Sequence, residues 1–505
     1  MENMCRSYKA FLGVLFALGM VFMISTTVNA DSLQGYEITI GENGGSFLVV
    51  DGKVVISGGE VTISGESKVP IRVIGDSKIV LSNAVISSSK GPAISIDSGV
   101  KADLILEGDN EVKGEGNGAG INVGFSSNDS MATLTIDGDG SLVATGGENG
   151  GAGIGGNGTK NLFAINGKIF IRGGQITAIA QKNSSGIGGG WGSESMIDKK
   201  YTAGSIHING GVISATGNGG SAGIGGGNYT DASITVDGGK LKSVYGGSYA
   251  AGIGGGLCSN NVDIKINDGT FNDIKGYESD ADEVLGGAAI GSGAKMCDAN
   301  TKVVMNISGG TVENAVAGWG AAGIGTGAGS DESSDITIGK GAKITRLYTD
   351  GERMPLEEGA NVEGNLLQAV FSESVDTSSE QSFEVVNYND ENEAYKIEMP
   401  KGYRAFATTV KKEADYSVRG SKYYADKEAS GKAEEKIKLN VASGTVMAYS
   451  GLHPVEDVPE RKLTDTKEGE SSIMMWIFMG AGALISVAVA YAVWAAVLAK
   501  KKFDY

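Results

Sequence analysis

The sequence has 505 residues, a formal net charge of −18, and 82 glycines against only 6 prolines. Collagen is excluded, because it needs abundant proline and a glycine at every third position. Nucleic-acid binding is not expected, since phosphates require a basic face. An acidic polysaccharide is disfavoured unless a local basic patch or bridging metal ions intervene. Many glycines among recurrent isoleucines and valines indicate short strands joined by tight turns.

The first 30 residues predict a secretory signal peptide. Arg6 and Lys9 precede an apolar run from Phe11 to Ile24, and Val28-Asn29-Ala30 supplies small residues at the cleavage positions. We therefore expect the mature chain to lie outside the cell.

A repeated unit, a small residue followed by Gly-Ile-Gly, dominates the middle of the chain. Consecutive units are separated by 33, 33, 37, 29, 37 and 34 residues, measured between isoleucines 121, 154, 187, 224, 253, 290 and 324. Such a regular period is typical of a solenoid, in which each repeat stacks on the next.

Two alternating strands separate successive units, for example Ile234-Thr235-Val236 followed by Asp237-Gly238. Alternation with period two places one face inside and the other outside. Residues 31–345 therefore predict a right-handed parallel β-helix with three strands per coil. A β-propeller is the main alternative, but its blades need about 40 residues each.

The remaining chain is divided by composition. Residues 346–451 predict a small β-rich domain that caps the solenoid, and residues 452–472 a polar stalk. Residues 473–499 carry no charge and are long enough for one transmembrane helix. Residues 500–505, which begin with three lysines, predict a cytoplasmic tail. The expected location is the cell membrane, with the N-terminal part outside.

Three cysteines are present, and Cys5 lies in the predicted signal peptide. Cys258 and Cys297 each follow a glycine-rich unit, so stacking brings them close enough for a disulfide outside the cell. The alternative is that both are buried thiols that never pair.

Three acids are the candidate metal ligands or catalytic groups, namely Asp137, Asp237 and Asp268. They occupy equivalent turn positions, where Asn209 stands in another coil. This exchange favours a turn role, because Asp and Asn both tolerate left-handed backbone. Calcium bridging between stacked turns is one alternative, and acid catalysis on a polysaccharide is the other.

Aromatic side chains near the glycine units are candidate sugar-binding platforms. They are Trp191, Tyr229, Tyr245, Tyr249 and Trp319. They do not form a periodic ladder, so shielding of turns is the competing interpretation.

The glycines themselves offer another candidate surface. Alternation predicts that Ala222 and Ile224 point inward, whereas Gly223 and Gly225 point outward. We expect a flat strip without side chains, against which a polysaccharide or another sheet packs closely. On this interpretation, bulky residues at the two glycines abolish binding and leave the fold intact.

The chain resembles bacterial surface proteins described as carbohydrate-binding-domain-containing. The resemblance rests on Ile79–Ile86, Gly91–Ile94 and Leu104–Asn110, and on the repeated Ala-Gly-Ile-Gly-Gly-Gly. It covers roughly residues 36–345 and implies a right-handed parallel β-helix. It also implies polysaccharide binding, with calcium in some members.

The interpretation favoured by these observations is a non-catalytic surface protein that binds or adheres to glycans. One alternative is a polysaccharide lyase or glycoside hydrolase of β-helix type. Another is a structural surface protein that contacts other protein chains.

Overall fold

The computed structural model describes residues 35–425, 439–440 and 450–454, with gaps at 128, 160–163, 193–203, 277–284, 298–300, 331–333, 372–376, 388–389, 413 and 420–422. These residues form an all-β structure without an α-helix, so no described helix is long and apolar enough to cross a membrane. The predicted signal peptide, transmembrane helix and tail lie outside the described residues, as does the predicted stalk beyond Pro454.

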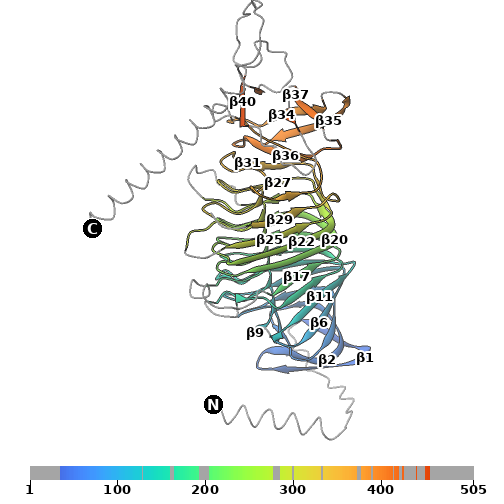
Figure 1. Cartoon of the computed structure of the whole chain (residues 1–505). Coiled ribbons are helices and arrows are strands. Elements are labelled where there is room, and N and C mark those ends of the chain that lie inside the picture. Colours follow the sequence, from blue (N-terminus) through green and yellow to red (C-terminus); the bar gives the residue numbers. More distant parts are fainter. Residues whose placement is uncertain are drawn as a thin grey trace, which may run out of the picture. The chain divides into compact units, whose positions relative to one another are not determined.

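Most strands belong to three ladders of parallel strands, which recur in chain order and are part of one 34-stranded sheet (Figure 1). Within these ladders each strand pairs in parallel with its counterpart in the next coil, unlike the antiparallel strands of a propeller blade. β2 (Lys53–Ser67) and β4 (Ser77–Ser87) each run through more than one ladder.

Ladder A continues through β6 (Lys101–Glu107), β11 (Thr133–Gly138), β14 (Lys168–Ile171), β17 (Ser205–Ile208), β20 (Ala232–Tyr245), β22 (Asn261–Phe271), β25 (Lys302–Ile307), β29 (Ser334–Ile338) and β32 (Asn361–Val362). Ladder B comprises β7 (Asp109–Lys113), β12 (Ser141–Thr145), β15 (Gln175–Ile179), β18 (Val212–Thr216), the second half of β20, β23 (Ile274–Lys275), β26 (Thr311–Val312), β27 (Ala315–Val316), β30 (Lys343–Ile344) and β31 (Leu347–Thr349).

Ladder C contains the Gly-Ile-Gly units. Its strands are β3 (Ile71–Val73), β5 (Ile94–Ile96), β8 (Ile121–Val123), β13 (Ile154–Gly155), β16 (Ile187–Gly188), β19 (Ile224–Gly225), β21 (Ile253–Gly254), β24 (Ile290–Gly291) and β28 (Ile324–Gly325). A short antiparallel hairpin, β9 (Phe125–Ser127) with β10 (Ser130–Met131), is inserted after β8.

The predicted stacking of the repeat isoleucines is confirmed. Ile121, Ile154 and Ile187 lie in register on successive coils, and the column continues through isoleucines 224, 253, 290 and 324. All seven are buried in one hydrophobic core that all three ladders line. Burying each side chain contributes about 1.5–3 kcal/mol, so the period of the sequence and the stability of the stack have the same origin.

The glycine after each repeat isoleucine has a backbone that other residues rarely adopt. Gly188, Gly225 and Gly254 have φ values of 128°, 131° and 131°. A Cβ atom built on Gly225 would lie 2.0 Å from the carbonyl oxygen of Gly254 and 3.0 Å from Ile234 Cδ1. The same carbonyl contact recurs at Gly188, at 2.0 Å from the oxygen of Gly225. These glycines therefore allow neighbouring coils to approach at strand spacing.

Polar side chains bridge successive coils at the turn between ladders A and B. Both carboxylate oxygens of Asp237 accept hydrogen bonds, from Asn209 Nδ2 at 3.2 Å and from Asn267 Nδ2 at 2.7 Å. Ser308 Oγ in turn lies 3.0 Å from Asn267 Oδ1. This column satisfies polar groups at a position where the chain turns sharply in every coil.

Antiparallel strands lie at both ends of the stack. β1 (Tyr36–Val50) pairs along the whole of β2. At the other end, β36 (Ala405–Thr409) pairs with β31 and with β33 (Leu366–Phe371). Glu357 caps the glycine column there, because its Oε2 accepts hydrogen bonds from the Thr326 amide at 2.7 Å and hydroxyl at 2.8 Å.

The segment after residue 345 also consists of strands, and it contains a four-stranded antiparallel sheet. Its strands are β34 (Gln381–Asn387), β35 (Asp390–Met399), β37 (Asp415–Arg419) and β39 (Leu439–Asn440). Phe371, Phe383 and Phe406 form a second core, with ring centroids 5.5–6.2 Å apart. β38 (Tyr423–Ala425) pairs with β40 (Ser450–Pro454), which extends into the predicted stalk.

Glu393 is buried in this segment and accepts several hydrogen bonds. Its donors are Tyr395 Oη at 2.7 Å, Tyr416 Oη at 2.8 Å, Asn387 Nδ2 at 2.9 Å and the Lys411 amide at 3.2 Å. Burial alone would raise the pKa of Glu393, but the hydrogen bonds outweigh burial and lower the pKa below its ordinary value.

Replacing Gly225 with alanine should lower the free energy of unfolding by about 2–5 kcal/mol, because strained backbone and overpacking add. Denaturant unfolding followed by circular dichroism measures the change. Gly364→Ala is the matched control, since its Cβ would meet nothing closer than Lys340 Cα at 3.8 Å. Equal stability of the two variants would contradict the importance of the glycine column.

Glu393→Gln should destabilise the chain at pH 7 and have a smaller effect near pH 3. A carboxyl group with a lowered folded-state pKa contributes stability above its unfolded pKa, about 4.3, and loses it as the pH falls through the folded value. Thermal unfolding at both pH values tests this, with the exposed Glu384→Gln on β34 as control. The prediction would be wrong if the difference in melting temperature between wild type and Glu393→Gln were as large near pH 3 as at pH 7.

Candidate functional site

Three of the predicted aromatic residues lie on neighbouring coils, in the loops that flank ladder C. We call this region the aromatic corner and define it by Trp191, Asn228, Tyr229, Tyr249 and Cys258. The Gly192 amide donates to the Asn228 carbonyl at 3.1 Å, and the Tyr229 amide donates to the Leu257 carbonyl at 3.0 Å. Ala294 connects Cys258 with Tyr249. Its carbonyl accepts from the Cys258 amide at 3.2 Å, and its amide donates to the Tyr249 carbonyl at 2.6 Å.

The backbone of the aromatic corner is left-handed at three residues with side chains. Tyr229, Tyr249 and Cys258 have φ values of 62°, 69° and 59°. A bulky residue in this conformation costs about 1–3 kcal/mol, and such residues gather at functional sites. Both tyrosines are half-buried rather than shielded in the core. Glycine or asparagine would suit these positions better, so strain alone does not explain the tyrosines.

A buried amide lies beside Tyr229. Asn228 is only 9% exposed, and its Oδ1 has no hydrogen-bond partner among the residues that the structure describes. Its side chain lies over Gly220, where a Cβ would be 3.1 Å from Asn228 Cγ. A buried acceptor without a donor is costly, so a hydroxyl group supplied by a ligand or a water would stabilise this position.

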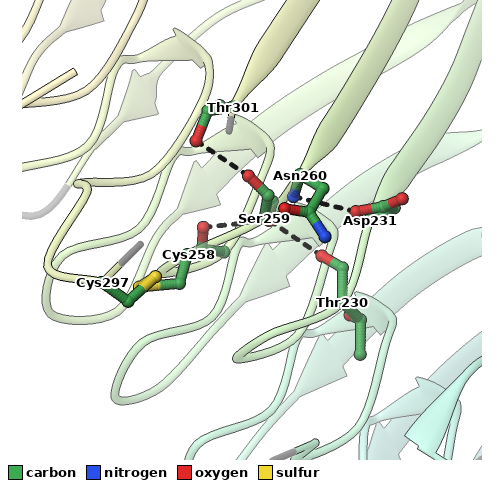
Figure 2. Close-up of a disulfide and its surroundings, with 8 residues drawn as sticks. Thr230, Asp231, Cys258, Ser259, Asn260, Cys297 and Thr301 are labelled. Atoms are coloured by element: carbon green, nitrogen blue, oxygen red, sulfur yellow. Dashed lines mark hydrogen bonds between the residues drawn. A yellow bond between two sulfur atoms is a disulfide. The ribbon is translucent and has the colours of Figure 1, made fainter. Parts of the chain in front are cut away.

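A disulfide joins Cys258 of the aromatic corner to Cys297 (Figure 2). Their Cα atoms lie 6.1 Å apart. Beside it, Ser259 Oγ donates to the Thr230 carbonyl at 2.8 Å and Thr301 Oγ1 donates to the Ser259 carbonyl at 2.9 Å. Covalent and hydrogen bonds therefore tie three successive coils together at the strained backbone.

The remaining aromatic candidates do not all join this region. Tyr245 lies on ladder B, where its hydroxyl donates to Asp273 at 2.6 Å, and burial with this hydrogen bond raises its pKa. Trp319 lies two coils beyond Tyr249, and its carbonyl accepts from the Gly286 amide. Trp191 has the Lys182 ammonium 5.7 Å from its ring centroid. The structure thus places Trp191, Tyr229 and Tyr249 on loops of neighbouring coils that backbone hydrogen bonds connect, whereas Tyr245 lies on ladder B.

The predicted glycine strip is wrong. Gly223 and Gly225 are buried, although they were expected to point outward. A Cβ on Gly223 would lie 2.7 Å from Val244 Cγ1, because ladder B packs against this part of ladder C. The strands of ladder C are only two residues long here, and the positive φ at Gly225 breaks the alternation on which the prediction rested.

The three candidate acids hold turns. Asp137 Oδ1 and Asp268 Oδ1 accept from the amides of the following glycines, at 2.8 and 2.7 Å. Asp237 bridges two asparagines, as described above. Within the described part of the chain, no group of three or more His, Cys, Asp or Glu side chains is placed to hold a metal ion. A hollow of about 480 Å³ at the turn between β6 and β7 has acidic walls but contains none of the three.

Sequence reasoning missed Asn228 and a pair of rings on ladder A. Phe170 and His207 lie in register, with centroids 4.8 Å apart and an interplanar angle of 13°. Each ring occupies the outward position of an Ile-x-Ile strand, which is visible in the sequence. That the two rings stack becomes visible only when the two coils are aligned.

Comparison with known proteins gives no match to a family model, a curated protein or a solved structure. Function must therefore be argued from the residues of this chain.

Removing the disulfide with Cys258→Ser and Cys297→Ser should lower the free energy of unfolding by about 2–4 kcal/mol, because a cross-link over 39 residues restricts the unfolded chain. Thermal unfolding with and without reductant is the measurement. Reductant should lower the melting temperature of the wild type and leave the double variant unchanged. A wild type insensitive to reductant would contradict a stabilising disulfide.

Proposed function

We propose that this chain is a non-catalytic cell-surface protein that binds polysaccharide through the aromatic corner. The observation that carries the proposal is the pair of half-buried tyrosines, Tyr229 and Tyr249, at left-handed positions on neighbouring coils. Aromatic rings bury much apolar area and provide faces for sugar rings, and beside them the buried Oδ1 of Asn228 has no donor among the described residues.

The scaffold of this proposal is a right-handed parallel β-helix with three strands per coil. Its support is the recurrence of ladders C, A and B in the same order from coil to coil. A right-handed connection is the rule for parallel strands in one sheet. The scaffold matters for binding, because loops at one corner of every coil come to lie side by side.

The proposed location is the outer face of a cell membrane, to which residues 473–499 anchor the chain. The signal peptide and the uncharged C-terminal segment are the sequence basis of this proposal. The Cys258–Cys297 disulfide supports it, since disulfides persist in oxidising compartments. The repeat motifs resemble those of carbohydrate-binding surface proteins, and this resemblance agrees with the proposed location.

A structural role in contact with other protein chains is the second candidate, and β1 favours it. Its only partner among the described strands is β2, and Ile40 and Leu48 are 49% and 57% exposed. An unpaired strand edge with exposed apolar residues is a template for strand addition. Self-association of the purified chain, together with no binding signal on a glycan array, would favour this candidate over glycan binding.

The double variant Tyr229→Asn/Tyr249→Asn should lose glycan binding and keep or gain stability. Asparagine tolerates left-handed backbone, so the substitutions relieve strain while removing both rings. A glycan array with the purified full chain, in the presence and absence of a calcium chelator, measures binding, and thermal unfolding measures stability.

Phe substitutions at the same two positions are the matched control, because they keep the rings and the strain. Glycan binding retained by the asparagine variant would contradict the proposal. Release of shortened sugars from the array ligand would instead indicate a lyase or hydrolase.

A further inference from the structure

Ladder A carries a local concentration of positive charge on this acidic chain. Lys168 begins β14 and Arg172 directly follows it; both are exposed, and Phe170 stands between them on the strand. His207 lies beside Phe170 on the next coil. The general charge of −18 therefore does not describe this part of the surface.

The two cations have no carboxylate partner within 4.0 Å among the residues that the structure describes. The nearest turn acids are hydrogen-bonded to neutral groups, because Asp137 Oδ1 accepts from the Gly138 amide and Asp237 accepts from Asn209 and Asn267, and neither forms an ion pair with Lys168 or Arg172. Lys265, which lies farther along the ladder, has Asp263 at 3.8 Å. Lys168 and Arg172 thus remain available to an external anion.

Phe170 between the cations and His207 on the next coil add an aromatic pair to the surface. Phe170 and His207 stack on one another, so they stand side by side along the coil axis. The edge of an aromatic ring is the positive part of its quadrupole, whereas the face is negative. Because the two rings face each other, one face of each ring is covered by the other ring.

We infer that Lys168, Phe170, Arg172 and His207 form a binding site for an anionic polysaccharide that carries carboxylates. Residues four apart on a strand have Cα atoms about 13 Å apart, and Phe170 stands between these two, so cations spaced in this way match a polymer that carries repeated acid groups. Ser205 and Thr235 on the neighbouring strands offer hydroxyls to its sugars. This inference rests on the proposed glycan-binding function but uses a different surface.

A nucleic acid is a less suitable polyanion for this surface. Two cations neutralise few phosphates, and bases require free aromatic faces for stacking. Binding of single-stranded DNA at equal affinity would overturn the inference.

The test measures binding of the purified full chain to polygalacturonate and to its neutral methyl ester. The wild type should bind the acid form and not the ester. Lys168→Gln/Arg172→Gln should weaken binding about tenfold, since each exposed ion pair contributes up to roughly fivefold. Lys302→Gln, which removes an exposed charge from β25 of the same ladder, should leave it unchanged. No binding by the wild type, or equal loss in the Lys302 control, would overturn the site.

Two further arms separate this site from the aromatic corner. Tyr229→Asn/Tyr249→Asn should still bind polygalacturonate, and Lys168→Gln/Arg172→Gln should still bind the neutral glycans found on the array. Polygalacturonate binding that disappears with the tyrosines would place the anionic ligand at the corner and refute the assignment to ladder A.

Discussion

The close approach of one glycine backbone to the next is the constraint on which the structure depends. At Gly155, Gly188, Gly225, Gly254 and Gly291, a Cβ atom would lie 1.7–2.0 Å from the carbonyl oxygen of the succeeding glycine. No other residue type fits both this contact and the accompanying φ. Because the contact repeats along ladder C, each coil fixes the position of the next. The isoleucine that precedes each glycine then occupies the same position in the core of every coil.

The sequence predicts much of this arrangement. Alternating strands, the isoleucine period and the Asp-Gly turns indicate parallel stacking, and the pairing of Ile121 through Ile324 agrees. These features are local or periodic, so a single sequence contains them. The β-rich segment after residue 345 was also foreseeable from composition, but its antiparallel pairing with β31 was not. That pairing joins strands almost 60 residues apart and has no periodic signal.

The prediction from alternating residues is wrong where the strands of ladder C are only two residues long. Gly223 and Gly225 were expected on the surface, yet the chain bends at the second glycine and ladder B covers the first. The candidate sites show the same limit. Neither the unpartnered Asn228 nor the pairing of Phe170 with His207 is visible until coils are placed side by side. A side chain's neighbours in a solenoid come from sequence positions 29–37 residues away, with varying offsets.

Antiparallel strands at both ends of the stack have a consequence for its evolution. β1 is antiparallel to β2 at one end of the stack, and β36 is antiparallel to β31 of ladder B at the other, so neither strand presents the parallel pairing found between interior coils. Growth by duplication is therefore confined to the interior, where a new coil inherits parallel neighbours on both sides. Inserted coils would increase the distance between the terminal strands without altering either strand. The number of coils can therefore change during evolution while the two terminal strands are kept.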